Sequence, residues 1–331
     1  MGVYVDDLTI TYKYDEPYSL YSTLTKAMVA RWKVEDEGDI EDLLGVEFSF
    51  SDKAITLKQT AYIERMVREY LPDGIPDTIQ VSSLPCDKTL PQVVADALSC
   101  TDAPDPALLK RYQSIVGALL YAATNTRPDI AFAVNYLCRA MSRPSPELLE
   151  RAYVVLAYLA RHKDIGLCYE ADGKPLRGQS DSDWGVQHSI TGWLFKYSSA
   201  CVSWGSKKQS SVALSSCEAE IMAGSEASKE GVYLRRFLDE LGLGDSAPTE
   251  LGMDNQSAIA ISYNPELHSR TKHIDRRHFF IRECVENHQL RVPFVATAEN
   301  MSDFFTKPLP PKHFFRMRNI IMNVPSHALQ N

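Results

Sequence analysis

The segment that decides the fold is residues 176–220, which read LRGQSDSDWGVQHSITGWLFKYSSACVSWGSKKQSSVALSSCEAE. β-Forming residues gather in three short stretches of it, which predict meandering strands over Leu176–Trp184, Gly192–Tyr197 and Ala200–Trp204. A long helix is predicted directly afterwards, over about 216–240. Strands followed by a long helix are typical of a sheet that carries helices on its faces.

The chain beyond this helix alternates strand and helix signals. We predict a strand over Glu250–Met253, helices over 256–263 and 272–287, a strand over Gln289–Val295 and a closing helix from about 302. With the first three strands, these elements give a mixed five-stranded sheet with flanking helices over about 167–320, followed by a tail over 321–331. The predicted fold class is therefore α/β in this part and α+β for the whole chain.

The chain before this sheet falls into two further parts. Residues 1–75 alternate strand and helix signals, and a stretch rich in Pro, Ser and Asp then runs to about residue 106. Three helices are predicted over about 107–125, 128–142 and 146–163. We therefore expect one domain over 1–75 and a linker with a helical connection over 76–166.

Composition narrows the functional classes. The 331 residues are 44% hydrophobic and 24% charged, as in soluble globular proteins, and the longest apolar run, Ile115–Ala123, is too short to cross a membrane. The seven cysteines are scattered without zinc-site spacing or a disulfide framework, so we expect free thiols in a reducing compartment. A formal net charge of −8 counts mildly against nucleic acid, although residues 267–282 hold five Lys/Arg and one Asp, a local +4.

Four acidic residues occupy informative places in the predicted elements. Asp181 lies on the first strand, Glu218 in the first turn of the long helix, Asp254 after the fourth strand and Asp303 in the first turn of the closing helix. Strand ends and helix starts share one edge of such a sheet, so the four carboxylates are expected to meet there. Carboxylates that lie close together repel one another, and a cation between them relieves this repulsion. Their oxygen atoms are suitable ligands for Mg²⁺, a hard ion that prefers oxygen. Two such ions assist both the attacking water and the leaving oxygen of a phosphodiester.

Each acid also has an ordinary structural explanation. Ser215 with Glu218 fits a capping box, and Asp254 and Asp303 fit helix caps. Asp181 and Asp183 fit turn residues, and for each acid taken alone the structural explanation is preferred. Only the joint order of the four favours a catalytic site.

That order carries a resemblance to a known family. The matching segments are Gln179–Trp184, Val202–Gln209, Ala213–Glu220, Asp254–Ile259, His268–Asp275 and Asp303–Leu309. They resemble the RNase H domain of copia-type retrotransposon Pol polyproteins, in the family's order, whereas integrases share the fold but not this order. Ile221 and Ser302 depart from the family's usual Tyr and Ala, and neither is a metal ligand.

The resemblance implies an RNase H-like fold and a defined chemistry. It implies a metal set of Asp181, Glu218, Asp254 and Asp303, with Asp183 as the alternative to Asp181 because both share a strand face. The implied reaction is metal-dependent hydrolysis of the RNA strand of an RNA–DNA hybrid, with two Mg²⁺ ions or Mn²⁺ in their place. An active element of this kind works in the cytoplasm or in a virus-like particle.

The front of the chain resembles a reverse transcriptase of the same family. Tyr4-Val5-Asp6-Asp7 is similar to its catalytic hairpin, Leu43–Tyr70 to the rest of its palm, and 107–163 to the segment that joins polymerase to RNase H. The family also uses an aspartate and fingers that would precede residue 1. We therefore expect Asp6 and Asp7 to be relics of a polymerase metal site, with polymerase activity only if other Pol-derived chains supply the missing part.

A basic run supplies the candidate contacts to nucleic acid. It consists of Arg270, Lys272, Arg276, Arg277 and Arg282. Phosphate binding and an ordinary solvated helix face explain it equally well. Nearby His268, His273 and His278 are candidates for proton transfer. The alternative function from another class is a catalytically silent nucleic-acid-binding remnant or scaffold.

Overall fold

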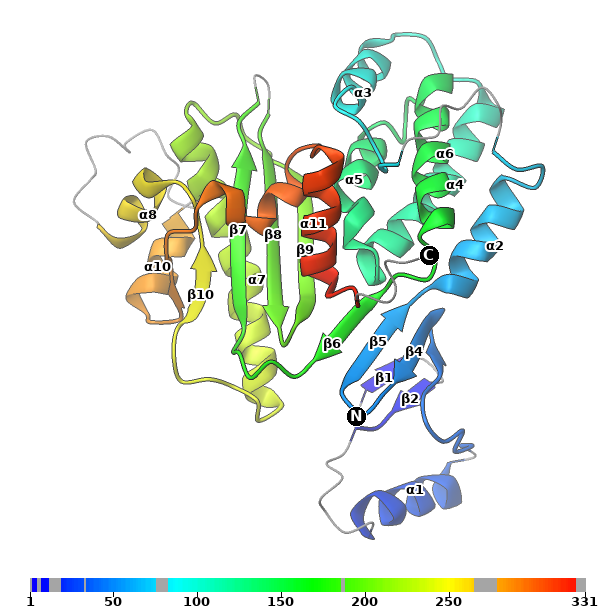
Figure 1. The fold of residues 1–331 in the computed structure, drawn as a ribbon, viewed down its shortest axis with the longest axis vertical. Helices are drawn as coiled ribbons and strands as arrows, with labels where there is room; N and C mark the ends of the chain where they lie inside the picture. The colour runs from blue at the N-terminus through cyan, green and yellow to red at the C-terminus, as the bar shows by residue number, and fades with distance from the viewer. Residues whose placement is uncertain are drawn as a thin grey trace.

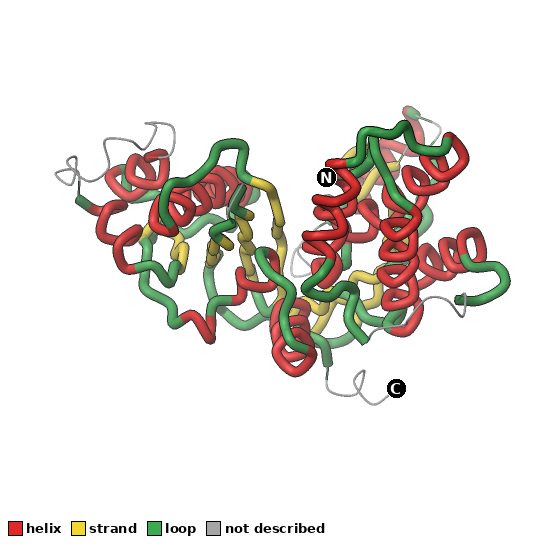
Figure 2. The backbone as a smooth tube through the Cα atoms, turned by 90° about the horizontal axis from the view of Figure 1, so that it is seen from above, coloured by secondary structure: helices red, strands yellow, loops and turns green. Residues whose placement is uncertain are grey.

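The structure is a computed structural model that describes residues 2–4, 7–11, 19–32, 34–75, 83–185, 188–264 and 279–325. Figure 1 shows one sheet with its helices on one side of the molecule, and a helical group above a smaller sheet on the other. Seen from above in Figure 2, the helix near the C-terminus lies between these two halves. No helix among the described residues is long and apolar enough to span a membrane.

The N-terminal part is built on short antiparallel strands. A hairpin of β1 (Gly2–Tyr4) and β2 (Asp7–Thr9) precedes α1 (Ser19–Arg31). A second sheet has the order β3 (Asp42–Leu43), β4 (Val46–Phe50), β5 (Ala54–Lys58) and β6 (Leu167–Glu170). Since β6 pairs with β5, the chain returns to this sheet before the five-stranded sheet starts at residue 177. This differs from our boundary at 167, because cross-sheet pairing leaves no local signal.

Helices connect the two sheets. They are α2 (Thr60–Tyr70), α3 (Leu90–Ser99), α4 (Pro106–Asn125), the 3₁₀ turn η1 (Pro128–Ile130), α5 (Ala131–Arg139) and α6 (Pro146–Arg161). The starts of α4 and α6 follow from sequence: the side chains of Asp105 and Ser145 accept from N–H groups of the first turn, and a proline follows each. Helix α3 lies in the predicted linker, where its buried Leu90, Val93 and Val94 hold it against α5 and α6.

The five-stranded sheet has the predicted mixed topology. Its strands are β7 (Arg177–Asp183), β8 (Ile190–Tyr197), β9 (Ala200–Lys208), β10 (Thr249–Gly252) and β11 (Leu290–Arg291). Their spatial order is β11-β10-β7-β8-β9, with β7, β8 and β9 antiparallel and with β10 parallel to both β7 and β11. The predicted fold class is confirmed.

Helices cover both faces of this sheet. One face packs against α7 (Ser216–Glu240), which in turn contacts α8 (Gln256–Tyr263) and α10 (Phe280–Glu286). The other face carries the 3₁₀ helix η4 (Met301–Phe305), preceded by η3 (Thr297–Glu299), and α11 (Pro311–Met322). Each face of the sheet has its own hydrophobic core. On β8, Phe195 belongs to the first core, on the face covered by α7, while Ile190 and Leu194 belong to the second core, on the face covered by η4 and α11.

The second core is continuous with the connecting helices. It joins Ile115 and Leu156 of those helices to Phe304 and Phe314 of η4 and α11. The rings of Phe304 and Phe314 stack at 4.9 Å, and Phe314 packs edge-on against Tyr158 of α6 at 5.9 Å. The connecting helices therefore support the segment that carries Asp303.

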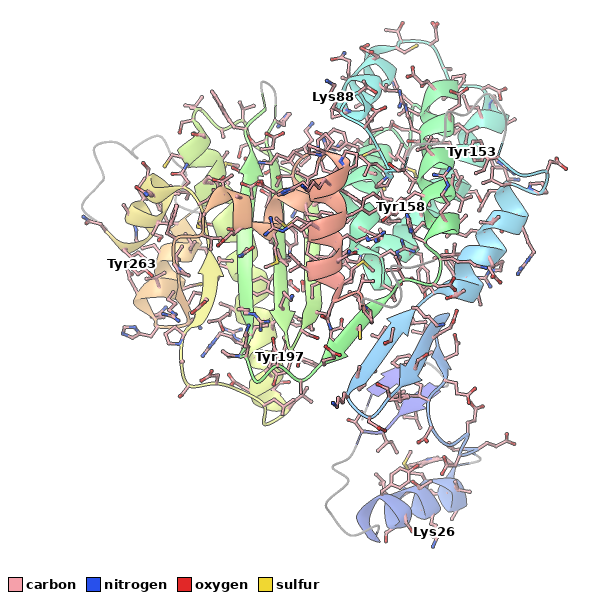
Figure 3. The ribbon with its side chains drawn as sticks, viewed as in Figure 1. Lys26, Lys88, Tyr153, Tyr158, Tyr197 and Tyr263 are labelled. Carbon is pink, nitrogen blue, oxygen red and sulfur yellow. The ribbon has the colours of Figure 1, made fainter. Side chains whose placement is uncertain are left out.

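A buried polar network reinforces the same junction. Asp129 is fully enclosed, receives two hydrogen bonds from the Arg127 guanidinium at 2.9 and 2.7 Å, and accepts a third from the Tyr158 hydroxyl at 2.6 Å. Burial opposes the charge on Asp129, but Arg127 and Tyr158 hold its pKa below the usual value. Arg318 of α11 reaches the same hydroxyl at 3.4 Å. Tyr158, labelled in Figure 3, thus links α6 with α11.

Candidate active site

Asp181 lies on β7, the central strand of the sheet. Strand alternation turns it to the face covered by η4, and its register partner is Gly192 of β8. The carboxyl is 4% exposed and accepts a hydrogen bond of 2.5 Å from the Thr306 hydroxyl. Burial and the neighbouring negative charge of Asp303 raise its pKa from 3.8 to about 6. The hydrogen bond therefore fixes the position of the Asp181 side chain, while its surroundings disfavour the charged form of the carboxyl group.

Glu220 approaches Asp181 from α7. Its Oε1 accepts from the backbone N–H (3.1 Å) and the hydroxyl (3.0 Å) of Ser182. The side chain is 5% exposed, and its Oε2 has no hydrogen-bond partner among the described residues. Burial, followed by the negative charge of Asp181, raises the pKa of Glu220 to about 8.

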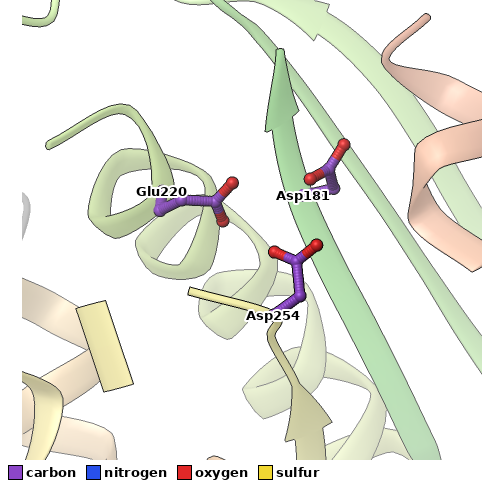
Figure 4. A group of neighbouring side chains, drawn as sticks. All are labelled: Asp181, Glu220 and Asp254. Carbon is purple, nitrogen blue, oxygen red and sulfur yellow. The ribbon is translucent and has the colours of Figure 1, made fainter. Parts of the chain in front are cut away.

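Asp254 completes a compact group with these two acids. It follows β10 and precedes Asn255, whose side chain caps α8 by accepting from the Ala258 N–H. One carboxylate oxygen from each of Asp181, Glu220 and Asp254 lies within 4.8 Å of the others. Figure 4 shows the three carboxylates converging from the strand β7, the helix α7 and the end of β10. Three separate elements therefore bring their charges to one point.

Asp303 lies beside this group on η4 and is 5% exposed. Its carboxyl is within hydrogen-bonding reach of Asp181, and the Lys307 ammonium lies 2.9 Å from its Oδ1. Although burial opposes charge on Lys307, the hydrogen bond that it donates to Asp303 and the charge of Asp181 raise the pKa of this lysine. Asp303 therefore lies at the predicted edge of the sheet, and the Lys307 ammonium partly balances its negative charge.

Glu218 lies outside the cluster. Its backbone N–H donates to the Ser215 hydroxyl at 3.1 Å, and its Oε2 accepts from the Leu214 N–H at 2.7 Å. This is the cap that the sequence also allowed. Two residues along a helix correspond to a rotation of about 200°, so Glu218 and Glu220 leave α7 on nearly opposite sides. Glu220 takes the place that we predicted for Glu218.

The other predicted site residues are distributed as follows. Asp183, the alternative to Asp181, ends β7 and is exposed. Arg282 is 9% exposed and donates twice to the Ile261 carbonyl, at 3.1 and 2.8 Å, with its guanidinium over the Phe279 ring. Two of the Arg282 nitrogens are therefore bound inside the protein, and its contact with phosphate stays a prediction.

Several predicted residues fall outside the part of the chain that is described. They are Asp6, Arg270, Lys272, Arg276, Arg277 and the three histidines His268, His273 and His278. For Asp7, the structure describes the backbone, which begins β2 opposite Tyr4. The predicted hairpin is thus present. All seven cysteines are described and are free thiols.

The donor set of the cluster fits a divalent cation. All its ligand atoms are carboxylate oxygens, which Mg²⁺ and similar hard ions prefer. The unpartnered Oε2 of Glu220 is a buried acceptor that a cation would satisfy. Burial and, after it, the negative charges of neighbouring carboxylates raise the pKa values of Asp181 and Glu220, and a bound cation would favour their charged forms.

Curated proteins with related sequences include the Pol polyproteins of transposons. The chain is 34% identical over 328 residues to the retrovirus-related Pol polyprotein from transposon TNT 1-94 of Nicotiana tabacum, matching 96% of this chain and 24% of that protein. A putative transposon Ty5-1 protein of Saccharomyces cerevisiae is 30% identical over 237 residues, covering 70% of this chain and 73% of that protein. The chain belongs to the copia-type retrotransposon Pol family. The resemblance predicted from its motifs is confirmed.

This Pol-family chain spans only a fraction of its longer relatives. It covers 24% of the tobacco protein and 20% of the Pol polyprotein from transposon RE1 of Arabidopsis thaliana, to which it is 34% identical over 317 residues. No family model matches the chain. Among solved structures, RNase H1 from Halobacterium salinarum matches 40% of this chain and 93% of its own at 14% identity and a TM-score of 0.28. The foamy viral protease-reverse transcriptase, solved with double-stranded DNA, matches 62% of this Pol-family chain and 35% of its own at 14% identity and a TM-score of 0.38.

Three residues of the site were missed from the sequence. Glu220, Thr306 and Lys307 all lie next to predicted ligands, inside segments that the resemblance already included. A signal for Glu220 was present, because Gly224, Ala227 and Gly231 follow it at helical spacing. That stripe of small residues is the face of α7 that packs on the sheet.

Proposed function

We propose that this Pol-family chain is an RNase H-type endonuclease that hydrolyses the RNA strand of an RNA–DNA hybrid. The observation that carries the proposal is the convergence of Asp181, Glu220 and Asp254, with Asp303 beside them. Four buried or half-buried carboxylates at a sheet edge have a high electrostatic cost without cations. A phosphodiester hydrolase with two divalent cations needs such a set of ligands.

Each residue has a distinct part in the proposed site. Asp181, held by the Thr306 hydroxyl, is central because Glu220, Asp254 and Asp303 all lie near it. Glu220 and Asp254 would hold one cation with Asp181, and Asp303 would help Asp181 to hold a second. When bound, Mg²⁺ or Mn²⁺ would activate the attacking water and stabilise the leaving 3′ oxygen, giving 3′-hydroxyl and 5′-phosphate ends.

Lys307 contributes positive charge on the Asp303 side of the site. Its ammonium, 2.9 Å from Asp303, lowers the negative potential where a phosphate must enter. The side chain is 37% exposed, so it can also turn toward an incoming phosphodiester. Lys307 is therefore a positioning group for the backbone of the strand to be cut.

The proposal is tested with end-labelled RNA–DNA hybrid, single-stranded RNA and double-stranded DNA of one sequence. We expect cleavage of the RNA in the hybrid with Mg²⁺, no cleavage with a chelator, and little cleavage of the other two substrates. Asp254→Asn removes one charged ligand and should lower the rate by about 100-fold or more. Full cleavage by Asp254→Asn, or by the chelated protein, would refute the proposal. Binding of the hybrid without any cleavage by the unmodified chain would instead favour the silent binding remnant.

A further inference from the structure

Three exposed apolar side chains lie in segments that adjoin the end of β7 and the start of α7. Trp184, Val212 and Leu214 are 55%, 51% and 70% exposed. Trp184 comes one residue after β7 ends, three residues beyond Asp181, and Leu214 comes just before α7, the helix that carries Glu220. The three side chains therefore belong to the segments that adjoin the two elements carrying Asp181 and Glu220.

Hydrogen bonds hold together the two segments that carry these side chains. The Trp184 indole N–H donates to the Ala213 carbonyl at 3.1 Å, between Val212 and Leu214 in the chain. The Leu214 N–H donates to Glu218 Oε2 at 2.7 Å. Glu218 thus has a role in the structure other than metal binding, since it anchors the segment that presents Leu214.

The same segment is anchored at its other end. The Gln209 side chain donates to the Thr191 hydroxyl (3.0 Å) and to the Ala219 carbonyl (2.9 Å), and it is 5% exposed. Ala213 packs with Ala219 and Met222 of α7. The exposed apolar groups are therefore held in fixed positions, which favours a preformed contact surface over a loose loop.

We propose that Trp184, Val212 and Leu214 form an apolar platform that packs against the sugars next to the scissile phosphate. This inference rests on the proposed function and names the part of the substrate that the site contacts beyond the phosphate. The indole N–H is already bound to Ala213, so the ring offers only carbon atoms to a ligand. Apolar atoms match the C–H faces of ribose better than phosphate oxygens, which need donors or cations.

The groove geometry of the substrate supports sugars as the ligand. Base faces are stacked inside a duplex, whereas an A-like helix displays its riboses along a wide and shallow minor groove. If a phosphate is held near Asp181 and Glu220, the flanking sugars lie next to the end of β7 and the start of α7. These are the positions of the platform residues.

The test measures hybrid binding in chains that all carry Asp254→Asn, so that the substrate stays intact. The chain with Asp254→Asn alone is the parent, and its Kd is measured by fluorescence anisotropy of a labelled hybrid. We expect the additional substitution Trp184→Ala to raise this Kd by about 5- to 30-fold. Trp184→Phe, which keeps an aromatic ring, should retain most of the affinity. The dependence of log Kd on log salt should be unchanged, because the platform neutralises no phosphate.

Tyr233→Ala is the matched control. Tyr233 is 61% exposed on α7, far along the helix from Glu220, and its loss should leave Kd unaltered. Equal Kd values for Trp184→Ala and its parent would overturn the platform, as would equal weakening by Tyr233→Ala. A parent that binds hybrid tightly while the unmodified chain never cuts it would refute the proposed function and leave the platform standing. Failure of both the parent and the unmodified chain to bind hybrid would refute both.

Discussion

Replacing Glu220 by glutamine should stabilise the protein in the absence of divalent cations. Glutamine has nearly the same shape and keeps an oxygen for the two hydrogen bonds from Ser182. Its amide N–H₂ would take the place of the unpartnered Oε2 and face the carboxylates of Asp181 and Asp254. The substitution therefore replaces the repulsion between carboxylates by hydrogen bonds that the amide group donates to Asp181 and Asp254.

The magnitude follows from the raised pKa of Glu220. Its ordinary value of 4.5 rises to about 8 in the folded protein, so the folded state holds this proton more tightly than the unfolded state. The contribution of Glu220 to the stability of the metal-free protein is then fully present below pH 4.5 and is lost as the pH rises to about 8. The full difference corresponds to about 5 kcal/mol, an upper limit because Asp181 shares the same repulsion. We expect Glu220→Gln to recover about 1 to 3 kcal/mol above pH 8 and almost nothing at pH 4.5.

The assay is urea unfolding with a chelator between pH 4.5 and 8.5. Glu218→Gln is the matched control, because it makes the same chemical change two residues away and outside the cluster. Its loss of the charged bond to Leu214 should destabilise the protein slightly at neutral pH. Mg²⁺ at ten times its Kd should reduce the stability difference between Glu220→Gln and the unmodified chain by about 1.4 kcal/mol, because it stabilises the unmodified chain by that amount and Glu220→Gln much less. Equal stability changes for Glu220→Gln at pH 4.5 and 8.5 would refute this reasoning.

Three further predictions concern residues around the site. Gly192→Ala puts a Cβ 2.6 Å from the methyl group of Thr306, so we expect a loss of about 1–3 kcal/mol in unfolding free energy and at least a tenfold lower cleavage rate; an unchanged cleavage rate would contradict it. Tyr158→Phe removes the hydroxyl that links α6 with α11, which should cost about 1–3 kcal/mol and weaken Mg²⁺ binding measured by calorimetry, whereas Tyr153→Phe on the same helix should leave Mg²⁺ affinity intact. Arg282→Met should lower the unfolding free energy by about 1–3 kcal/mol without changing the salt dependence of hybrid binding, and a shallower salt slope would show that Arg282 contacts phosphate after all.

The five-stranded sheet could be predicted because its signals are local. Alternating residues and turns gave β7 to within a residue at each end, and helical spacing gave the bounds of α7. The affiliation of β6 with the N-terminal sheet could not be predicted in this way. Its partner strand, β5, lies more than 100 residues earlier, and nothing local distinguishes the two sheets.

The site could be predicted as a place but not in every residue. Asp181 and Asp254 follow from the edge where strands end, and the structure brings both together. The choice between Glu218 and Glu220 depends on which side of α7 faces the sheet. The sequence motif led us to predict Glu218, whereas the structure places Glu220 beside Asp181 and Asp254. The burial of Arg282 could not be predicted for a similar reason, since a count of basic residues ignores which of them point inward.

Cleavage of the hybrid by two glutamine variants tests the central claim most directly. Single-turnover rates with saturating Mg²⁺ should fall by about 100-fold or more for Glu220→Gln and stay within about threefold of the unmodified chain for Glu218→Gln. The reverse order, or equal rates for both variants, would contradict a nuclease site built on Asp181, Glu220 and Asp254.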